Sequence, residues 1–343
     1  MKLANMMRIK ILATCFCSIL LATSYGQVAT DSTAEKMLVY QLGNGGWPKQ
    51  LEDKSVVNYD AGLSPELLAK IKSTKDLHAT FDNKATSREV IYLVKAYKKT
   101  GNKAYLQAAE KGIDYILTAQ YANGGWPQYY PDKALYRSEI TFNDDAMINV
   151  LNILQDVATK RNDFEAVDAK YVPKAAKAVT TGINCILQTQ VKQNGQLTIW
   201  AAQYDKDSLL PAKARNFEPA SLATSESVGI VRFLMSLDKP SKEIKTAVAA
   251  ALKWFETYKI QGYRFDREKG KVAALVADDS SMVWARFYDL DKNAPIFGDR
   301  DNTIKSKLEE LSPERRSGYA WYGNWAQKLI EKEYPKWLAA KGK

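Results

Sequence analysis

The chain has 343 residues, of which 46% are hydrophobic, so it can bury one large core or two modest ones, and a disordered protein is excluded. Its formal net charge is +10, which favours an anionic partner. Nucleic acid is a common anionic partner, but no helix-turn-helix, zinc-ligand or RNP pattern is visible, and we expect no nucleic-acid binding.

Residues 1–26 have the three-part layout of a secretory signal peptide. Lys2, Arg8 and Lys10 precede the apolar run ILATCFCSILLATSYG, which polar residues follow. This apolar run has about 16 residues, whereas a membrane-spanning helix needs roughly 20. We therefore expect cleavage near Gly26, no stable membrane insertion afterwards, and export to the periplasm or the extracellular space.

The mature chain, 27–343, is expected to form a single domain without an internal disulfide bond. Cys15 and Cys17 lie in the signal segment, where the surroundings of Cys15 fit lipid attachment poorly, and only Cys185 remains afterwards. The apolar context GINCILQ predicts that Cys185 lies in the core. Removal of three signal cations lowers the formal charge from +10 to +7, and an exported basic protein fits an acidic polysaccharide better than nucleic acid.

Helical periodicity dominates the mature chain. Apolar stripes with i, i+3, i+4 spacing run through 87–100, 103–121, 147–154 and 228–235. The fold class is therefore mostly α.

The predicted helices recur in a repeated frame. An apolar helix ends with glutamine and a glycine turn, a long irregular loop follows, and a polar cluster opens the next helix; the pentapeptide NGGWP appears in two of these turns. The glycine turns are about 70 residues apart, a period that indicates stacked helical hairpins; they fall near Gly45, Gly124, Gly195 and Gly262. Such hairpins predict an α/α toroid, an incomplete barrel whose long loops line a groove on one face.

Polar clusters open three of the predicted helices. TFDN at 80–83 and TFND at 141–144 occupy equivalent points of the repeat, and Glu218, Ser225 and Glu226 precede a third helix. Oxygen ligands from several loops suit Ca²⁺. The same residue types also cap helices and stabilise the helix dipole. Spacing alone leaves both interpretations open, although recurrence in a closed toroid would bring the clusters to one rim.

Histidine is nearly absent, which limits the chemistry. His78 is the single histidine, and no GxSxG motif accompanies it, so a Ser-His-Asp or Cys-His nucleophile is disfavoured. One histidine and one mature cysteine also cannot supply the usual zinc ligands.

Arginines and aromatic residues gather in the loop segments. Guanidinium groups bind carboxylates bidentately and suit a uronic-acid chain, with surface salt bridges as the alternative. The arginines are Arg215, Arg232, Arg286, Arg300, Arg315 and Arg316. Aromatic rings pack on the apolar faces of sugars, so we expect several to face the groove, with core packing as the alternative. These are Trp47, Trp126, Tyr129, Tyr130, Trp200, Trp321 and Tyr322, whereas Trp254 and Trp337 are assigned to the core.

Seven segments in a fixed order resemble the pectate lyases of polysaccharide lyase family 10. They are NGGWPKQ, TFDNKAT, NGGWPQYYP, ITFNDDAM, ARNFEPASLATSESVGIVRFLM, VWARFYDLDKNAPIFGDRD and ERRSGYAWYG, and they span residues 44 to 323. The resemblance implies an α/α toroid, Ca²⁺ dependence, and cleavage of α-1,4-linked polygalacturonate by β-elimination to unsaturated oligogalacturonates.

The resemblance also implies roles for single residues. Asp82 and Asp144 would form the acidic Ca²⁺ and substrate site, with Asp82 counted among the catalytic residues, and Arg215 would act as the base. The remaining residues assigned to substrate binding are Arg286, Arg300, Asn83 and Trp126. β-Elimination removes a proton from the carbon beside a carboxylate, so cations on that carboxylate stabilise the developing charge. A guanidinium base is unusual, because its pKa would have to be lowered greatly.

The chain departs from the family pattern at two places. Gln203-Tyr204-Asp205 stands where family members usually have Gln-His-Asp, and ADDSSM at 277–282 stands where a proline-rich segment is usual. Neither departure falls on a residue assigned to the chemistry.

Two other functions remain open from the sequence. A glycoside hydrolase would use two of Asp144, Asp145, Glu218 and Glu226, release saturated products and keep working after chelation. A non-catalytic carbohydrate-binding protein would bind pectin without cutting it. The leading prediction is an exported, monomeric, Ca²⁺-dependent pectate lyase.

Overall fold

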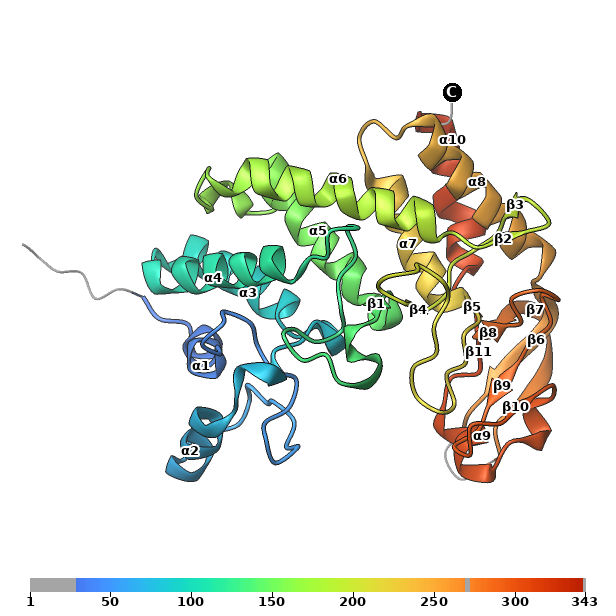
Figure 1. Ribbon diagram of the computed structural model, residues 1–343, viewed down its shortest axis with the longest axis horizontal. Helices are drawn as coiled ribbons and strands as arrows, with labels where there is room; N and C mark the ends of the chain where they lie inside the picture. Colours follow the sequence, from blue (N-terminus) through green and yellow to red (C-terminus); the bar gives the residue numbers. More distant parts are fainter. Residues whose placement is uncertain (1–28, 269–271, 342–343) are drawn as a thin grey trace, which may run out of the picture.

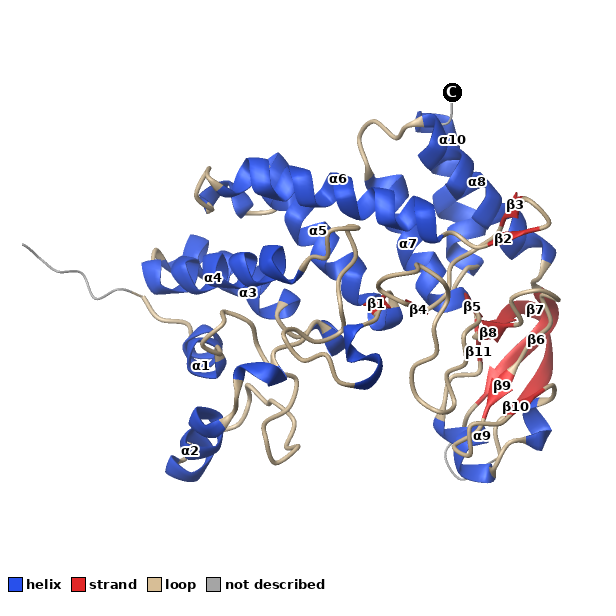
Figure 2. Ribbon diagram, viewed as in Figure 1, coloured by secondary structure: helices blue, strands red, loops and turns tan. Residues whose placement is uncertain are grey.

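The structure is a computed structural model that describes residues 29–268 and 272–341. The predicted signal peptide, 1–26, lies outside the described residues. Helices are the main elements of the molecule, and the longer strands gather near its C-terminal part (Figures 1 and 2).

Three antiparallel helical hairpins form the body of the fold. They are α3 and α4 (Ser87–Thr100, Lys103–Ala119), α5 and α6 (Ala146–Thr159, Tyr171–Thr189), and α7 and α8 (Thr224–Ser236, Lys242–Thr257). The first helices, α3, α5 and α7, contact one another in turn, and the second helices, α4, α6 and α8, do the same. This two-layered arrangement confirms the predicted incomplete α/α toroid (Figure 1).

Apart from strand β7, Ala274–Ala285, the remaining elements are short. Helix α1 (Ser32–Tyr40) packs on α3 and α4. The other helices are α2 (Pro65–Ser73), α9 (Pro313–Gly318) and α10 (Tyr334–Lys341), with single turns η1 (Asp76–His78), η2 (Asp82–Lys84), η3 (Leu135–Ser138), η4 (Asn143–Asp145), η5 (Phe164–Ala166), η6 (Leu308–Glu310) and η7 (Leu329–Glu333). The strands are β1 (Ile140–Thr141), β2 (Lys192–Gln193), β3 (Gln196–Leu197), β4 (Gln203–Tyr204), β5 (Leu222–Ala223), β6 (Ile260–Asp266), β7 (Ala274–Ala285), β8 (Phe287–Tyr288), β9 (Phe297–Gly298), β10 (Ile304–Lys305) and β11 (Tyr322–Gly323).

A glutamine directly after each of α1, α4 and α6 ties that helix to the hairpin that follows. The side-chain amide of Gln120 donates to the carbonyl of Gly124 in its own turn (3.1 Å) and to Ala178 of α6 (2.9 Å). Gln41 and Gln190 bridge in the same way, to Gly45 and Ala108 and to Thr198 and Ala247. These bonds satisfy turn and helix carbonyls and fix the stacking of neighbouring hairpins.

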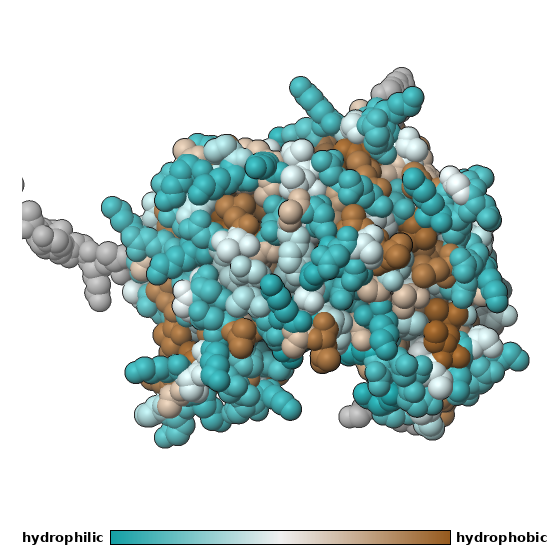
Figure 3. Space-filling view, in the orientation of Figure 1, coloured by the Kyte–Doolittle hydropathy of each residue, from teal (hydrophilic) through white to brown (hydrophobic). Residues whose placement is uncertain are grey.

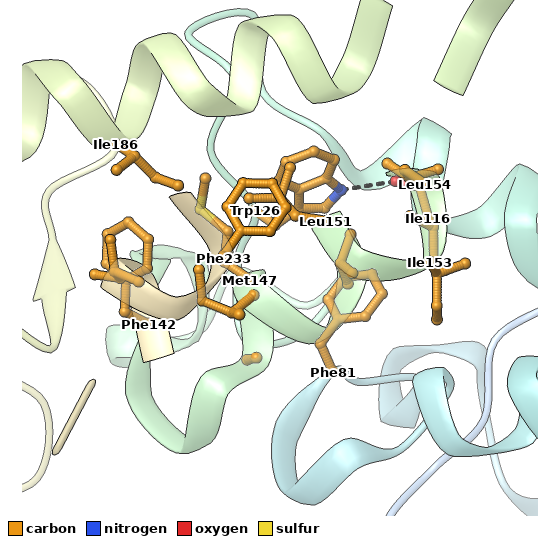
Figure 4. Packing of buried hydrophobic residues seen from close by; sticks show 14 of the residues in the cluster. Phe81, Ile116, Trp126, Phe142, Met147, Leu151, Ile153, Leu154, Ile186 and Phe233 are labelled. Carbon is orange, nitrogen blue, oxygen red and sulfur yellow. Dashed lines mark hydrogen bonds between the residues drawn. The ribbon is translucent and has the colours of Figure 1, made fainter. Parts of the chain in front are cut away.

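The tryptophan of each NGGWP segment belongs to the core, not to the groove. Trp126 is fully buried, and its indole N–H donates to the carbonyl of Ile116 (2.8 Å), in the last turn of α4 (Figure 4). The last carbonyls of a helix lack intrahelical partners, so the indole satisfies one of them while its ring fills the core. Trp47, Trp200 and Trp284 repeat this bond to Met37, Ile186 and Phe255. The assignment of Trp126 to substrate binding is therefore wrong.

Of the other predictions for single side chains, some are wrong and some are confirmed. Trp200 and Trp321 are also fully buried. The expectation that they face the groove is therefore wrong. Trp254 and Trp337 lie in the core, as assigned. Cys185 is buried as well, and burial raises the pKa of its thiol to about 12.

Glycines with a positive φ occupy the turns after the helices. Gly45 and Gly124 both have a φ of +91°, and the φ of Gly195 is also positive. The fourth predicted turn is wrong, because Gly262, although its φ is positive, lies within strand β6 where the pairing with β7 is irregular. A Cβ atom on Gly124 would lie 2.0 Å from the carbonyl oxygen of Thr181 in α6, so this turn approaches the next hairpin too closely for any side chain.

The C-terminal part adds a β-structure that helical periodicity does not indicate. Strands β6 and β7 pair antiparallel, and β11 joins the other edge of β7. The segment 277–282, which replaces the family's proline-rich stretch, lies within β7. A second, small core that includes Phe287, Phe297 and Trp321 lies beside it. Among the described helices, none combines the length and the apolar character that crossing a membrane requires.

Candidate active site

Three neighbouring cavities form one groove along the loops of the toroid. The central cavity, of about 150 Å³, is lined by Lys49, Asp82, Asn83, Gln128, Tyr136, Asn143, Asp144, Gln203, Arg215 and Glu218. Asn83 and Asp144 also line a second cavity of about 340 Å³ that contains Arg286, here called the Arg286 cavity. Arg215 and Tyr136 also line a third cavity of about 760 Å³ that contains Arg300, here called the Arg300 cavity.

The groove thus brings together every residue that the sequence assigned to the site except Trp126. In the space-filling view, the lower edge of the molecule is hollowed between the part that carries α2 and the part that carries α9 (Figure 3). The irregular loop before α7 and the η3 turn run toward this edge (Figure 1).

Asp82, Asn83 and Asp144 lie in two equivalent turns that precede α3 and α5. Asn83 has a φ of +50° and Asp144 a φ of +53°, a conformation that asparagine and aspartate adopt more readily than most residues. Neither turn, nor the helix after it, has a side-chain N-terminal cap. The structure therefore does not use these residues as helix caps, which was the alternative interpretation of TFDN and TFND.

The two aspartates of the central cavity have different surroundings. Asp82 is buried and forms an ion pair with Lys49. The pKa of Asp144 is raised, first by desolvation among the surrounding loops and then by the negative charge of Asp82. Two carboxylates that repel one another across a small cavity favour a cation between them.

The donors of the central cavity suit a hard cation. The carboxylates of Asp82 and Asp144 face the same space as the side-chain amides of Asn83 and Gln128, and the buried Oε1 atom of Gln128 has no hydrogen-bond partner. Oxygen ligands of this kind match Ca²⁺. Within residues 29–268 and 272–341, no three His, Cys, Asp or Glu side chains cluster as a metal site on their own, so amide oxygens, water or substrate would have to complete the shell.

Arg215 lies between the central and the Arg300 cavities and is held by Glu218. Its Nε atom donates to Glu218 Oε2 (2.7 Å), its Nη2 atom bonds the other carboxylate oxygen, and the hydroxyl of Tyr319 also donates to Glu218 (2.8 Å). The bond to Glu218 raises the pKa of Arg215 above its ordinary value. In this state Arg215 is a firmly protonated cation, the reverse of what a base requires.

Three guanidinium groups surround one phenylalanine beside the site. The Cζ atoms of Arg315, Arg215 and Arg300 lie 4.2, 4.7 and 5.5 Å from the centre of the Phe217 ring. Arg315 is buried and its Nε atom has no hydrogen-bond partner, and its pKa is lowered, chiefly by desolvation. This end of the groove therefore attracts anions strongly.

The two arginines assigned to substrate carboxylates differ in exposure. Arg286 is mostly buried, forms an ion pair with Glu226, and has an Nε atom without a partner. Burial lowers its pKa, but neighbouring carboxylates, first Glu226, outweigh this and raise it overall. Arg300 is exposed and pairs bidentately with Glu314 (2.7 and 3.0 Å).

Several lining residues escaped the sequence reasoning. Lys49 and Gln128 each follow an NGGWP segment directly, so the residue after this pentapeptide faces the central cavity in both repeats. Their shared position in the repeat could have been recognised from the sequence, whereas no sequence pattern indicates that Tyr136 lines the cavity. Tyr204 stands where the family pattern has histidine. It is buried, and its hydroxyl accepts a hydrogen bond from the backbone N–H of Ala201 (2.6 Å), so it does not alter the groove.

Comparisons with known proteins agree on the family. Residues 41–330 match the family described as pectic acid lyase. A solved structure of a family 10 polysaccharide lyase from Cellvibrio cellulosa is 35% identical, with a TM-score of 0.81 over 91% of this chain and 92% of that one. A mutant of that lyase in complex with trigalacturonic acid matches equally, with 35% identity, a TM-score of 0.81, and coverage of 91% and 93%. A comparison with curated proteins gives no match. The chain therefore belongs to polysaccharide lyase family 10 and is a pectate lyase.

Proposed function

We propose that this pectate lyase is exported and cleaves α-1,4-linked polygalacturonate by Ca²⁺-assisted β-elimination, with Arg215 as the base. The observation that carries the proposal is the central cavity, where Asp82, Asp144 and Arg215 line one space of about 150 Å³. The bound trigalacturonic acid of the related lyase supports polygalacturonate as the substrate class. The products are unsaturated oligogalacturonates.

The arginines on either side of the central cavity hold the substrate. Arg286 and Arg300 line the two adjoining cavities, so an extended anionic chain across the groove meets a guanidinium group on each side. Bidentate contacts to carboxylates would fix the sugar whose C5 proton is removed. Asn83 lines both the central and the Arg286 cavities and is assigned to a substrate hydroxyl.

The metal is assigned to the Asp82 and Asp144 side of the cavity, with amide oxygens in support. When bound, Ca²⁺ supplies a positive charge that stabilises the negative charge developing on the substrate carboxylate. Lys49, paired with Asp82, adds a fixed positive charge to the same side. Asp82 thus serves both as a ligand and as part of the electrostatic machinery.

Arg215 accepts the proton only if its pairing changes. Glu218 stabilises the protonated form, whereas Arg300 and Arg315, on the same phenylalanine ring, disfavour a further positive charge nearby. A base role therefore requires the bond between Arg215 and Glu218 to open when substrate enters. With its own proton first released to solvent, the neutral guanidine of Arg215 would take the C5 proton. The C5–H electron pair would form the C4=C5 double bond, and the glycosidic C4–O bond would break, its oxygen taking a proton from water.

Export, a single mature domain over 27–343 and a monomeric state complete the proposal. The basic net charge, +7 after loss of three signal cations, suits a polyanionic substrate outside the cytoplasm.

Replacement of Arg215 by alanine and by lysine tests the mechanism. Formation of unsaturated product should fall by about 10²–10⁴-fold, because the proton acceptor is lost, while trigalacturonate affinity changes far less. Arg161→Ala is the control, since Arg161 pairs with Asp238 on the surface and lines none of the three cavities. Retention of most activity in Arg215→Ala would remove Arg215 from the mechanism.

A further inference from the structure

A fourth cavity continues the groove beyond Arg286. It has a volume of about 750 Å³ and shares Asp145 and Ser225 with the Arg286 cavity. Residues of α5, of α7 and of the segment 324–332 line it. We call it the Trp325 cavity. Because the two spaces share lining residues, a chain bound over Arg286 can extend into the Trp325 cavity.

Trp325 is the exception among the tryptophans of this protein. The chain has eight, and the other seven are buried, whereas Trp325 is partly exposed and lines the cavity. Its indole packs directly on Gly323, where an added Cβ would lie 2.5 Å from the ring. The backbone therefore supports the ring, and a flat apolar surface held in this way suits the C–H face of a sugar.

Amide groups around the ring supply hydrogen bonds for sugar hydroxyls. Asn149 and Asn152 of α5 line the cavity, together with Asn324 and Gln327. The Nδ2 atom of Asn149 is buried and has no hydrogen-bond partner. A buried amide donor without a partner costs free energy, which a ligand hydroxyl or carboxylate would recover.

The charges of the cavity favour an anionic sugar at one point. Arg232 and Lys328 line it, but both pair with Glu333 (2.7 and 3.4 Å), and the carboxylates of Asp145 and Glu331 also line it. Lys332 lines the cavity too, and no ion pair joins it to any residue in the described part of the chain. Lys332 is therefore the cation available to a ligand carboxylate.

We propose that the Trp325 cavity is a distal subsite that binds a uronic-acid residue of the same polysaccharide chain whose scissile bond lies over the central cavity. The sugar packs on Trp325, its hydroxyls bond Asn149 and Asn152, and its carboxylate meets Lys332. The assignment of the ligand rests on the proposed function, because it takes the polymer to be polygalacturonate.

Chain-length dependence tests this subsite. With oligogalacturonates from the trimer to the octamer, kcat/KM of the full chain should rise until the substrate reaches Trp325. Trp325→Ala should remove this rise, with a loss that grows with length to about tenfold for the octamer. Lys332→Ala should cost about threefold for the octamer, and the cost should fade at high salt. Lys336→Ala is the matched control, because Lys336 is exposed one helical turn later and does not line the cavity.

Two further measurements distinguish loss of the subsite from misfolding and from failure of the proposed function. Trp325→Phe preserves an aromatic face, so it should keep most of the rise, which excludes misfolding as the cause of the alanine result. Equal losses at every length, or no loss at any length, would overturn the proposal. Octamer and trimer affinities, measured in an Arg215→Ala background without turnover, give a second test. If the wild type makes no unsaturated product, the proposed function fails, and these affinities still decide whether the subsite exists.

Discussion

Replacement of Trp126 separates a packing role from a substrate-binding role. The side chain is fully buried, and its N–H satisfies the Ile116 carbonyl at 2.8 Å. It also packs on α6, where a Cβ added to Gly182 would lie 3.1 Å from the ring. Trp126→Ala should therefore lower the free energy of unfolding by about 3–5 kcal/mol through the cavity it leaves. Trp126→Phe keeps much of the ring but leaves the carbonyl unsatisfied, which should cost about 1–3 kcal/mol.

Denaturant unfolding followed by circular dichroism measures these losses, and steady-state kinetics at a temperature where each variant is folded measures substrate binding. We expect KM for polygalacturonate to stay within about twofold of wild type, because Trp126 lines none of the cavities. Trp47→Phe should behave like Trp126→Phe, since its indole bonds Met37 in the same way. A tenfold rise in KM with unchanged stability would refute this account and return Trp126 to the groove.

Two other predictions concern a turn and an ion pair. Gly124→Ala should lower the melting temperature by several degrees, because its Cβ would lie 2.0 Å from the Thr181 carbonyl oxygen. Gly195→Ala should cost only about 1 kcal/mol of stability, because Gly195 has a positive φ but nothing within 4 Å of an added Cβ. Equal losses of stability in the two variants would contradict the close-approach argument. Burial raises the pKa of Glu218, but Arg215 outweighs burial and the folded-state pKa is lowered. The ionised Glu218 therefore stabilises the folded state at neutral pH. This contribution is lost as the pH falls from about 4.3, the ordinary glutamate pKa, through the lowered pKa of the folded state. Glu218→Gln should flatten this acid limb of the melting temperature, and parallel wild-type and variant curves would count against the pair.

The helical architecture could be predicted because one period governs it. The apolar stripes fall in helices of the three hairpins, and the turns at Gly45, Gly124 and Gly195 follow α1, α4 and α6. The β6 and β7 hairpin was missed, since 277–282 is a polar stretch whose pairing depends on β6, not on its own composition.

The site was predictable where residue chemistry and repetition coincide. Asp82, Asp144 and Arg215 do share one cavity, as the resemblance implied. The sequence could not show that the NGGWP tryptophans turn inward, because an indole suits a sugar and a helix carbonyl equally well. It also could not show the bond between Arg215 and Glu218, which depends on the turn of the backbone between them.

The most direct test of the central claim is the ultraviolet absorbance of unsaturated product from polygalacturonate, recorded with Ca²⁺ and again after chelation. We predict that absorbance rises with Ca²⁺, stops rising when the metal is chelated, and resumes when Ca²⁺ is restored. New reducing ends without this absorbance would mean hydrolysis, and an unchanged rise after chelation would contradict the role given to the metal.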